Sequence, residues 1–337
     1  MTIDSRNNIN IPNGINTSSI VDSQLITVAT ESFIDRIITS GDGGNIVLLA
    51  MEDIITGNFN AASSINLNLL TEVDTIEEAN LGFAAPFANL QVGRGGKVNF
   101  QAGNNIEVGN INSSSTVIID SDSVAVDNFS IINAILELNL AGGGDINLNA
   151  ENNITSQNIN SNVAVSDRFT SSAETTPNIT LSVSELTLTI PQGNLGSGGN
   201  IFLQAPEINT NSLNSSVAVV SDVNNTATIL ANDPNQATAE QPSRAFSTVD
   251  ILYENINIGQ GGEINLKSDR ANIDNINSSI GVTSNSVAFA QANAENNAVA
   301  NSNANNKINL NITGDRPGAV IFDVNSGVNF NDINLRL

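Results

Sequence analysis

One short pattern recurs five times along the chain and constrains its fold more than any other feature. Each copy is a cluster of three glycines followed by a five-residue stretch. In each stretch the first and third residues are large and apolar, and the fifth is small. Repetition of this kind is the signature of a solenoid or another repeat architecture. The five stretches begin at Ile46, Val98, Ile146, Ile201 and Ile264.

The apolar residues recur at every second position of each stretch, as Ile146, Leu148 and Ala150 show. Successive side chains of a β-strand point to opposite faces, so this alternation predicts a strand with one buried face. The preceding glycines predict a sharp turn, because glycine adopts positive φ values without a steric penalty.

A second motif follows each stretch at a nearly constant distance. Another apolar residue comes first, and a segment of Ile-Asn-Ser-Ser type follows it, with Phe59-Asn-Ala-Ala as its weakest copy. These segments begin at residues 59, 111, 159, 213 and 276, which are 52, 48, 54 and 63 residues apart. The intermediate apolar residues are Ile54, Ile106, Ile154, Ile208 and Ile273.

The variation in repeat length lies after this second motif, so we expect the variable segments to be surface loops. Two prolines between Asp233 and Pro242 also argue against a central strand there. The predicted loops span residues 71–90, 168–178, 222–250 and 285–306.

The pattern also reaches both ends of the chain. Met1, Ile3 and Ser5 have the phase of Ile46, Leu48 and Ala50, and residues 308–312 predict a further strand without its glycines. We therefore interpret residues 1–337 as one repeat array that is an internal slice of a longer protein. Solenoid ends without caps expose unpaired strand edges, which predicts end-to-end self-association.

Each repeat contains further alternations, including Ile65, Leu67 and Leu69. A repeat of about 50 residues is interpreted as two coils of roughly 20 to 25 residues, which gives about 12 coils. A coil cannot bury its inward face alone, whereas stacked coils share one core and pair their strands in parallel. The predicted fold is an all-β parallel β-helix with inserted surface loops. Asn beside Ile is expected to stack into hydrogen-bonded ladders between coils.

This combination of motifs resembles the repeats of filamentous haemagglutinin-like exoproteins. The resemblance covers nearly the whole chain and implies a right-handed parallel β-helix, secretion by a two-partner system through an outer-membrane transporter, and display as an adhesin. A secretion motif of that family is Asn-Pro-Asn-Gly-Ile. Residues 11–15, Ile-Pro-Asn-Gly-Ile, depart from it at the first position and lie within an ordinary repeat.

Composition excludes several classes of function. The chain has no Cys and no His, which rules out disulfides, thiolate or imidazole metal sites and His-dependent catalysis. Its net charge of −23 argues against nucleic acid or an anionic membrane as a partner. The N-terminal residues lack the pattern of a signal peptide, and no apolar run of 18 residues predicts a transmembrane helix.

The remaining candidates for chemistry are few. Asp120 and Asp122 form the best local carboxylate pair, and Glu77-Glu78 lies in a variable segment. Asp145 follows a glycine cluster but sits one residue too early for a calcium β-roll. Tyr253 is the only aromatic residue other than Phe, so platforms for sugar rings are scarce. We therefore predict no catalytic, cofactor-binding or metal-binding residue and no enzymatic activity.

Three functions remain open. The first is a structural and adhesive β-helical stalk of a secreted, cell-surface exoprotein, with a cell-surface or glycan receptor. The second is a non-adhesive repeat region of a multidomain protein whose activity lies outside this chain. The third is a β-helical polysaccharide-active enzyme, which would need two converging carboxylates.

Overall fold

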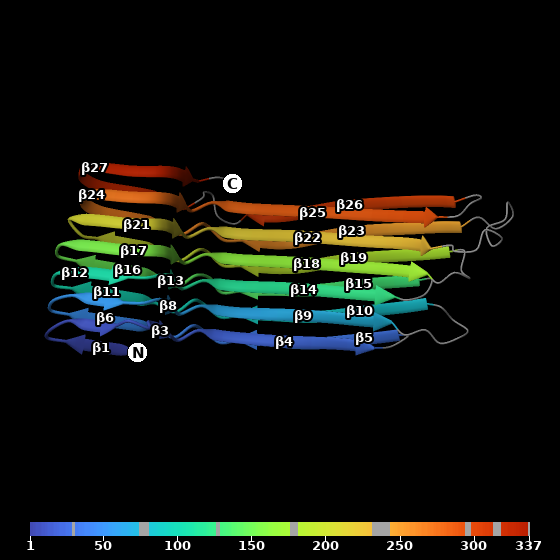
Figure 1. Cartoon of the computed structure of the whole chain (residues 1–337), viewed down its shortest axis with the longest axis horizontal. Helices are drawn as coiled ribbons and strands as arrows, with labels where there is room; N and C mark the ends of the chain where they lie inside the picture. Colours follow the sequence, from blue (N-terminus) through green and yellow to red (C-terminus); the bar gives the residue numbers. More distant parts are fainter. Residues whose placement is uncertain are drawn as a thin grey trace.

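The computed structural model describes residues 1–28, 31–73, 81–125, 129–175, 181–230, 243–293, 298–312 and 318–335. These residues form 27 strands and no helix. The strands lie in one sheet of 15 strands and two sheets of six strands, and every strand pair in them is parallel. The chain is a parallel β-helix, as the sequence predicts (Figure 1).

Sheet A, the 15-stranded sheet, is built from the repeated motifs. Its first set of strands contains the glycine-preceded stretches: β1 (Thr2–Ser5), β6 (Ile46–Ala50), β11 (Val98–Ala102), β16 (Ile146–Ala150), β20 (Ile201–Gln204), β24 (Ile264–Asn277) and β27 (Val320–Asn334). Its second set contains the Asn-rich motif: β2 (Ile9–Ile11), β3 (Ile15–Asn16), β7 (Ile54–Thr56), β8 (Phe59–Asn60), β12 (Asn105–Val108), β13 (Ile111–Asn112), β17 (Asn153–Asn160) and β21 (Glu207–Asn214).

Sheets B and C consist of long strands that face each other across a shared core. Sheet B contains β4 (Ser19–Val28), β9 (Ser63–Val73), β14 (Ser115–Ala125), β18 (Val163–Thr175), β22 (Val217–Leu230) and β25 (Ile280–Asn293). Sheet C contains β5 (Glu31–Ser40), β10 (Leu81–Val92), β15 (Phe129–Leu140), β19 (Leu181–Leu195), β23 (Ser243–Ile258) and β26 (Ala298–Ile312).

Each repeat forms one coil, so the interpretation as two coils per repeat is wrong. Ile46 pairs with Val98, Val98 with Ile146, and Ile146 with Ile201. Every coil runs once through sheets A, B and C, which gives six coils and the start of a seventh instead of about 12. At about 4.8 Å per coil, the six coils stack to roughly 30 Å. In Figure 1 the coils rise from the N-terminus to the C-terminus.

The predicted loops are largely strands, and this explains the error in the coil count. Residues 71–73 and 81–90 lie in β9 and β10, and residues 168–175 lie in β18. Residues 222–230 and 243–250 belong to β22 and β23, and residues 285–293 and 298–306 to β25 and β26. The rest of the predicted loops, residues 74–80, 176–178, 231–242 and 294–297, lies outside the described residues. Strands of 10 to 16 residues in sheets B and C therefore use the length that was assigned to loops.

The apolar residues of the five stretches are buried as predicted. At their first and third positions, the exposed fraction of each side chain is at most 1%. They belong to a core cluster inside sheet A, while a second cluster fills the space between sheets B and C. The residues are Ile46, Leu48, Val98, Phe100, Ile146, Leu148, Ile201, Leu203, Ile264 and Leu266.

Two positions at the C-terminal end differ from the sequence prediction. Ile308, predicted in a new repeat, pairs with Tyr253 in sheet C, and the seventh coil begins instead at Val320. Ile273 pairs with Thr210, and Ala271 occupies the position of Ile208. At the N-terminal end, Ile3 pairs with Leu48 as predicted.

The glycine clusters are required by a close backbone approach more than by positive φ. Among the clusters, only Gly142 has a positive φ, of 127°. A Cβ atom on Gly143 would lie 2.0 Å from the Ser161 carbonyl oxygen. The Gly144 N–H donates to the Ser113 carbonyl at 2.8 Å, and the Ser113 hydroxyl donates to the Gly96 carbonyl. The glycine cluster and the Asn-Ser-Ser segment are thus two sides of one junction, between sheet A and the long sheets.

The Asn that follows the apolar residue of the repeated segment acts within its own coil. The Asn112 Oδ1 accepts the Ser114 hydroxyl at 2.7 Å, and Asn214 and Asn277 make the same contact two residues ahead. Such short-range bonds stabilise a turn. The predicted ladder between coils is formed by the Asn that precedes the apolar residue of the segment. The Asn110 side chain donates to Asn58 at 3.2 Å and accepts from Asn158 at 2.9 Å.

The two ends of the stack expose parts of the core. Inward-facing residues of the end coils, such as Ile3 and Phe322, are only half-buried and pack against the sheet A core from one side. End-to-end self-association stays a prediction, because no contact with a second copy is described.

Candidate functional site

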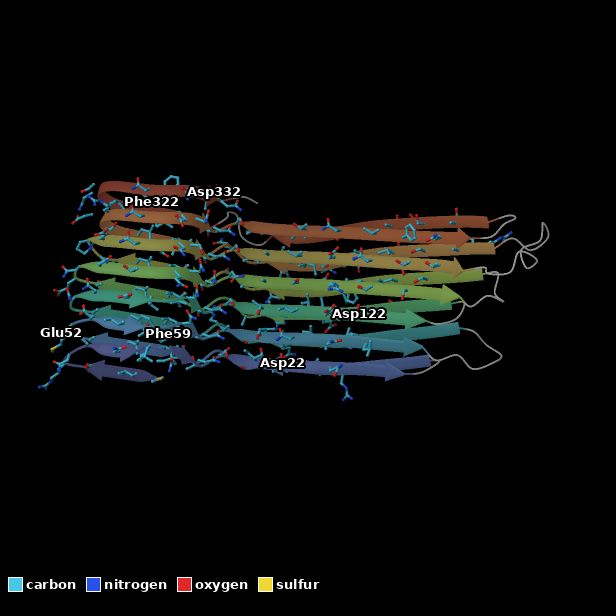
Figure 2. All side chains as sticks on the ribbon, viewed as in Figure 1. Asp22, Glu52, Phe59, Asp122, Phe322 and Asp332 are labelled. Atoms are coloured by element: carbon cyan, nitrogen blue, oxygen red, sulfur yellow. The ribbon has the colours of Figure 1, made fainter. Side chains whose placement is uncertain are left out.

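The structure places Asp120 and Asp122 at the molecular surface, where both are half-buried. Asp120 and Asp122 lie on the outer face of β14, and Figure 2 shows Asp122 among the long strands of sheet B. One Asp120 oxygen lies 3.7 Å from Nε of Arg168 on the next coil. Glu77-Glu78 lies outside the described residues.

Asp145 belongs to a column of turn contacts. Its carboxylate lies 3.4 Å from the Lys97 ammonium and accepts the Asn200 backbone N–H at 3.1 Å. Asn45 accepts the Lys97 N–H in the same way. Among the described residues, no three His, Cys, Asp or Glu side chains are grouped so that they could hold a metal ion. Within the same residues, no helix is long and apolar enough to cross a membrane.

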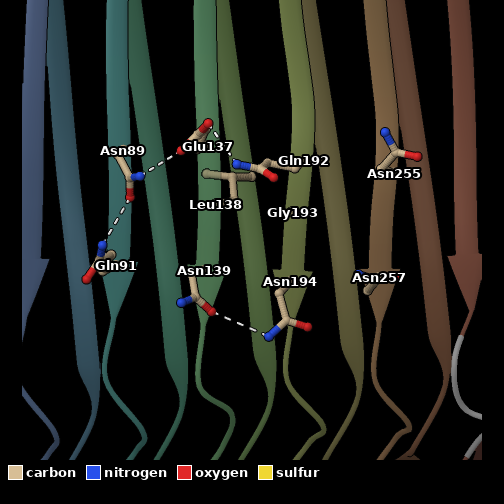
Figure 3. A pocket seen from close by; sticks show the side chains of 10 residues that line it. All are labelled: Asn89, Gln91, Glu137, Leu138, Asn139, Gln192, Gly193, Asn194, Asn255 and Asn257. Atoms are coloured by element: carbon tan, nitrogen blue, oxygen red, sulfur yellow. Dashed lines mark hydrogen bonds between the residues drawn. The ribbon is translucent and has the colours of Figure 1, made fainter.

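A groove on the outer face of sheet C is the strongest candidate for a binding site. It has a volume of about 370 Å³ and crosses four adjacent coils, on β10, β15, β19 and β23 (Figure 3). Its lining consists of one carboxylate, seven side-chain amides, Leu138 and Gly193. The amides belong to Asn89, Gln91, Asn139, Gln192, Asn194, Asn255 and Asn257. We call it the amide groove.

The polar residues of the amide groove form two rows, because equivalent positions of successive coils pair in register. The first row is Asn89, Glu137 and Gln192, and Asn255 continues it on β23, where its amide donates to the Pro191 carbonyl at 3.4 Å. The second row is Gln91, Asn139, Asn194 and Asn257. Adjacent parallel strands are about 4.8 Å apart, so each row of side chains presents one polar group per strand at that interval.

The Glu137 carboxylate is the centre of the groove. One oxygen accepts the Asn89 amide at 2.7 Å, and the other accepts the Gln192 amide at 2.8 Å. The donors belong to the coils on either side, so the carboxylate is held from both directions (Figure 3). The second row is held more loosely, since the Asn194 amide lies 3.4 Å from the Asn139 oxygen.

A β-bulge lies directly beside the groove. Thr189 pairs with Ile135 and Gln192 with Glu137, so Ile190 and Pro191 together oppose one residue of β15. A bulge is one of the few places in a sheet where proline is tolerated. On the neighbouring strand β23, beside the bulge, Asn255 adopts a φ of 48°. Asn tolerates this positive φ better than most residues do.

A second unusual group lies inside the molecule, between sheets B and C. Asp167 is 1% exposed, and its Oδ2 accepts the Tyr253 hydroxyl at 2.7 Å. Asp167 pairs with Ser221, and Ser221 with Ser284, on successive coils. The Asp167 Oδ1 and the hydroxyls of Ser221 and Ser284 are buried without a hydrogen-bond partner among the described residues.

Burial raises the pKa of Asp167 to about 6, because a carboxylate loses its hydration there. The nearby hydroxyls of Ser221 and Tyr253 oppose this rise. Burial also raises the pKa of Tyr253, and the charge of Asp167 adds to the effect. Tyr253 is therefore a buried donor to Asp167.

Compared with protein-family models, curated proteins and solved structures, the chain matches none.

Sequence reasoning missed both groups. The alternation of Val163, Val165, Asp167 and Phe169 already places Asp167 on the buried face, which was the available signal. The amide groove had no such signal, because its rows join residues that are 48 to 63 positions apart and depend on the one-coil register.

Proposed function

We propose that the chain is a structural and adhesive β-helical stalk of a secreted, cell-surface exoprotein of the haemagglutinin type. The observation that carries the proposal is the constant register of six stacked coils, which aligns outward side chains into rows on a broad surface. Regular coils that each contact only their neighbours are suited to extended binding surfaces. Passage through an outer-membrane transporter and display outside the cell are parts of the same proposal.

Adhesion can be tested directly on the isolated chain. Beads that carry the chain, attached through one of its ends, are expected to bind host or neighbouring bacterial cells. We expect more cells bound per bead than on beads that carry an unrelated acidic protein of similar charge. Attachment at several ionic strengths separates adhesion from nonspecific charge effects, which are screened by salt. Attachment equal to that of the control protein across a panel of cell types would refute adhesion and favour a non-adhesive repeat region.

A further inference from the structure

We propose that the amide groove binds uncharged oligosaccharide chains. This inference rests on the proposed adhesive function and names the class of receptor that the surface would recognise. It is carried by the two rows of polar side chains over four coils and by the groove of about 370 Å³ that they line.

The chemistry of the lining matches sugar hydroxyl groups. A hydroxyl both donates and accepts a hydrogen bond, and a side-chain amide offers both a donor and an acceptor. The Glu137 oxygens accept two amides, and each oxygen has a second lone pair that can accept a sugar hydroxyl. The groove therefore offers both donors and acceptors to vicinal hydroxyls.

The first row is organised before any ligand binds. Asn89 and Gln192 are fixed through Glu137, so their side-chain carbonyl oxygens have defined positions, and that of Asn89 also accepts the Gln91 amide at 3.4 Å. Fixing side chains in advance reduces the entropy that binding would otherwise cost. The second row, with its 3.4 Å contact between Asn194 and Asn139, can exchange a weak internal bond for a bond to a ligand.

Electrostatics select an uncharged ligand over an anionic one. Glu137 lies in the centre of the groove, and the chain has a net charge of −23. Sulfated, phosphorylated or carboxylated glycans would be repelled by this carboxylate and by the overall field. The same argument disfavours nucleic acid.

The dimensions favour a chain of sugars over a single sugar. The rows extend over four coils, which at about 4.8 Å per coil is roughly 14 Å between the outer strands. The groove has no aromatic platform in its lining, so each sugar contributes modest affinity through hydrogen bonds. Binding by several sugars, and by several copies displayed together, would then supply the avidity of adhesion.

The test is an array of immobilised neutral oligosaccharides, such as cello-, malto- and manno-oligosaccharides, with hyaluronan fragments as the anionic comparison. The double variant Asn139→Ala/Asn194→Ala removes two exposed amides of the second row and leaves the Glu137 contacts in place. Its matched control is Asn99→Ala/Asn147→Ala, which removes two amides paired in register on sheet A.

We expect the wild-type chain and the control to bind at least one neutral chain equally, and the groove variant to bind it at least tenfold more weakly. Binding to the anionic fragments alone, no binding to any neutral chain, or equal binding by the groove variant would each overturn the inference. Bead adhesion by the same proteins separates the two proposals. Adhesion that survives in the groove variant would leave the adhesive function standing on another surface, whereas wild-type beads that do not adhere would refute the adhesive function itself.

Discussion

Replacing Ile146 with Asp is expected to unfold most of the chain or to lower its melting temperature severely. Ile146 is 1% exposed and lies between Val98 and Ile201 in the sheet A core. A carboxylate at this position would have no partner, and burying an unpaired charge costs several kcal/mol. We expect a loss of at least about 4 kcal/mol, against a total stability of about 5–15 kcal/mol for ordinary proteins.

The control is Asn147→Asp, which adds the same charge one residue further along β16, where the side chain is exposed. Thermal and urea unfolding followed by circular dichroism compare the two variants. Equal melting temperatures of the two variants would refute the prediction that the Ile146 side chain points into the core.

Replacing Asp167 with Asn is expected to stabilise the chain at neutral pH and to change how its stability depends on pH. The pKa of Asp167 is raised from 3.8 to about 6 in the folded state. The folded state therefore holds this proton more tightly than the unfolded state does. Its contribution to stability is fully present below about pH 3.8 and is lost as the pH rises through about 6.

The size of this loss follows from the pKa difference. The shift is 6 − 3.8, or about 2 pKa units, and each unit corresponds to about 1.4 kcal/mol, which gives roughly 3 kcal/mol. Asn at this position cannot ionise, and its oxygen can still accept the Tyr253 hydroxyl.

Urea unfolding from about pH 4 to about pH 7.5 measures the effect. The unfolding free energy of Asp167→Asn minus that of the wild type should rise by roughly 2 kcal/mol across this range, because the carboxyl of the unfolded chain is already partly ionised at about pH 4. Asp122→Asn, on the outer face of sheet B, controls for the removal of one negative charge. A difference for Asp167→Asn that stays constant with pH would contradict the burial of an ionisable carboxyl group.

The sequence predicted the strands of sheet A correctly because their signal is local. Ile146, Leu148 and Ala150 alternate with polar residues, and alternation alone determines which side chains face inward. The phase at the N-terminus followed from the same rule, as the pairing of Ile3 with Leu48 confirms.

The long strands were mistaken for loops because their buried faces carry small and polar residues. Ser171, Asn225 and Ala227 are buried between sheets B and C, although their types are typical of turns and loops. Hydrogen bonds inside the sandwich compensate for this polarity. The Asn225 amide donates to the Ser184 and Thr248 carbonyls, both at 2.7 Å. Single-sequence patterns do not contain these contacts between distant segments.

The amide groove could not be predicted for the same reason, because its contacts join segments that are distant in the sequence. Glu137 is unremarkable in sequence and becomes central only when Asn89 and Gln192 lie on the coils beside it. Beside it lies the bulge at Ile190 and Pro191, which no periodic pattern predicts.

Cross-linking of paired cysteines tests most directly the claim that one repeat forms one coil. The chain has no Cys, so an engineered pair has no competing thiol. Asn99 and Asn147 pair in register on β11 and β16, where adjacent parallel strands are about 4.8 Å apart, within the Cα–Cα range of a disulfide. The account predicts that Asn99→Cys/Asn147→Cys cross-links efficiently on mild oxidation or with a short thiol reagent. Efficient cross-linking of Asn99→Cys/Asp122→Cys instead, about half a repeat apart, would contradict it and restore two coils per repeat.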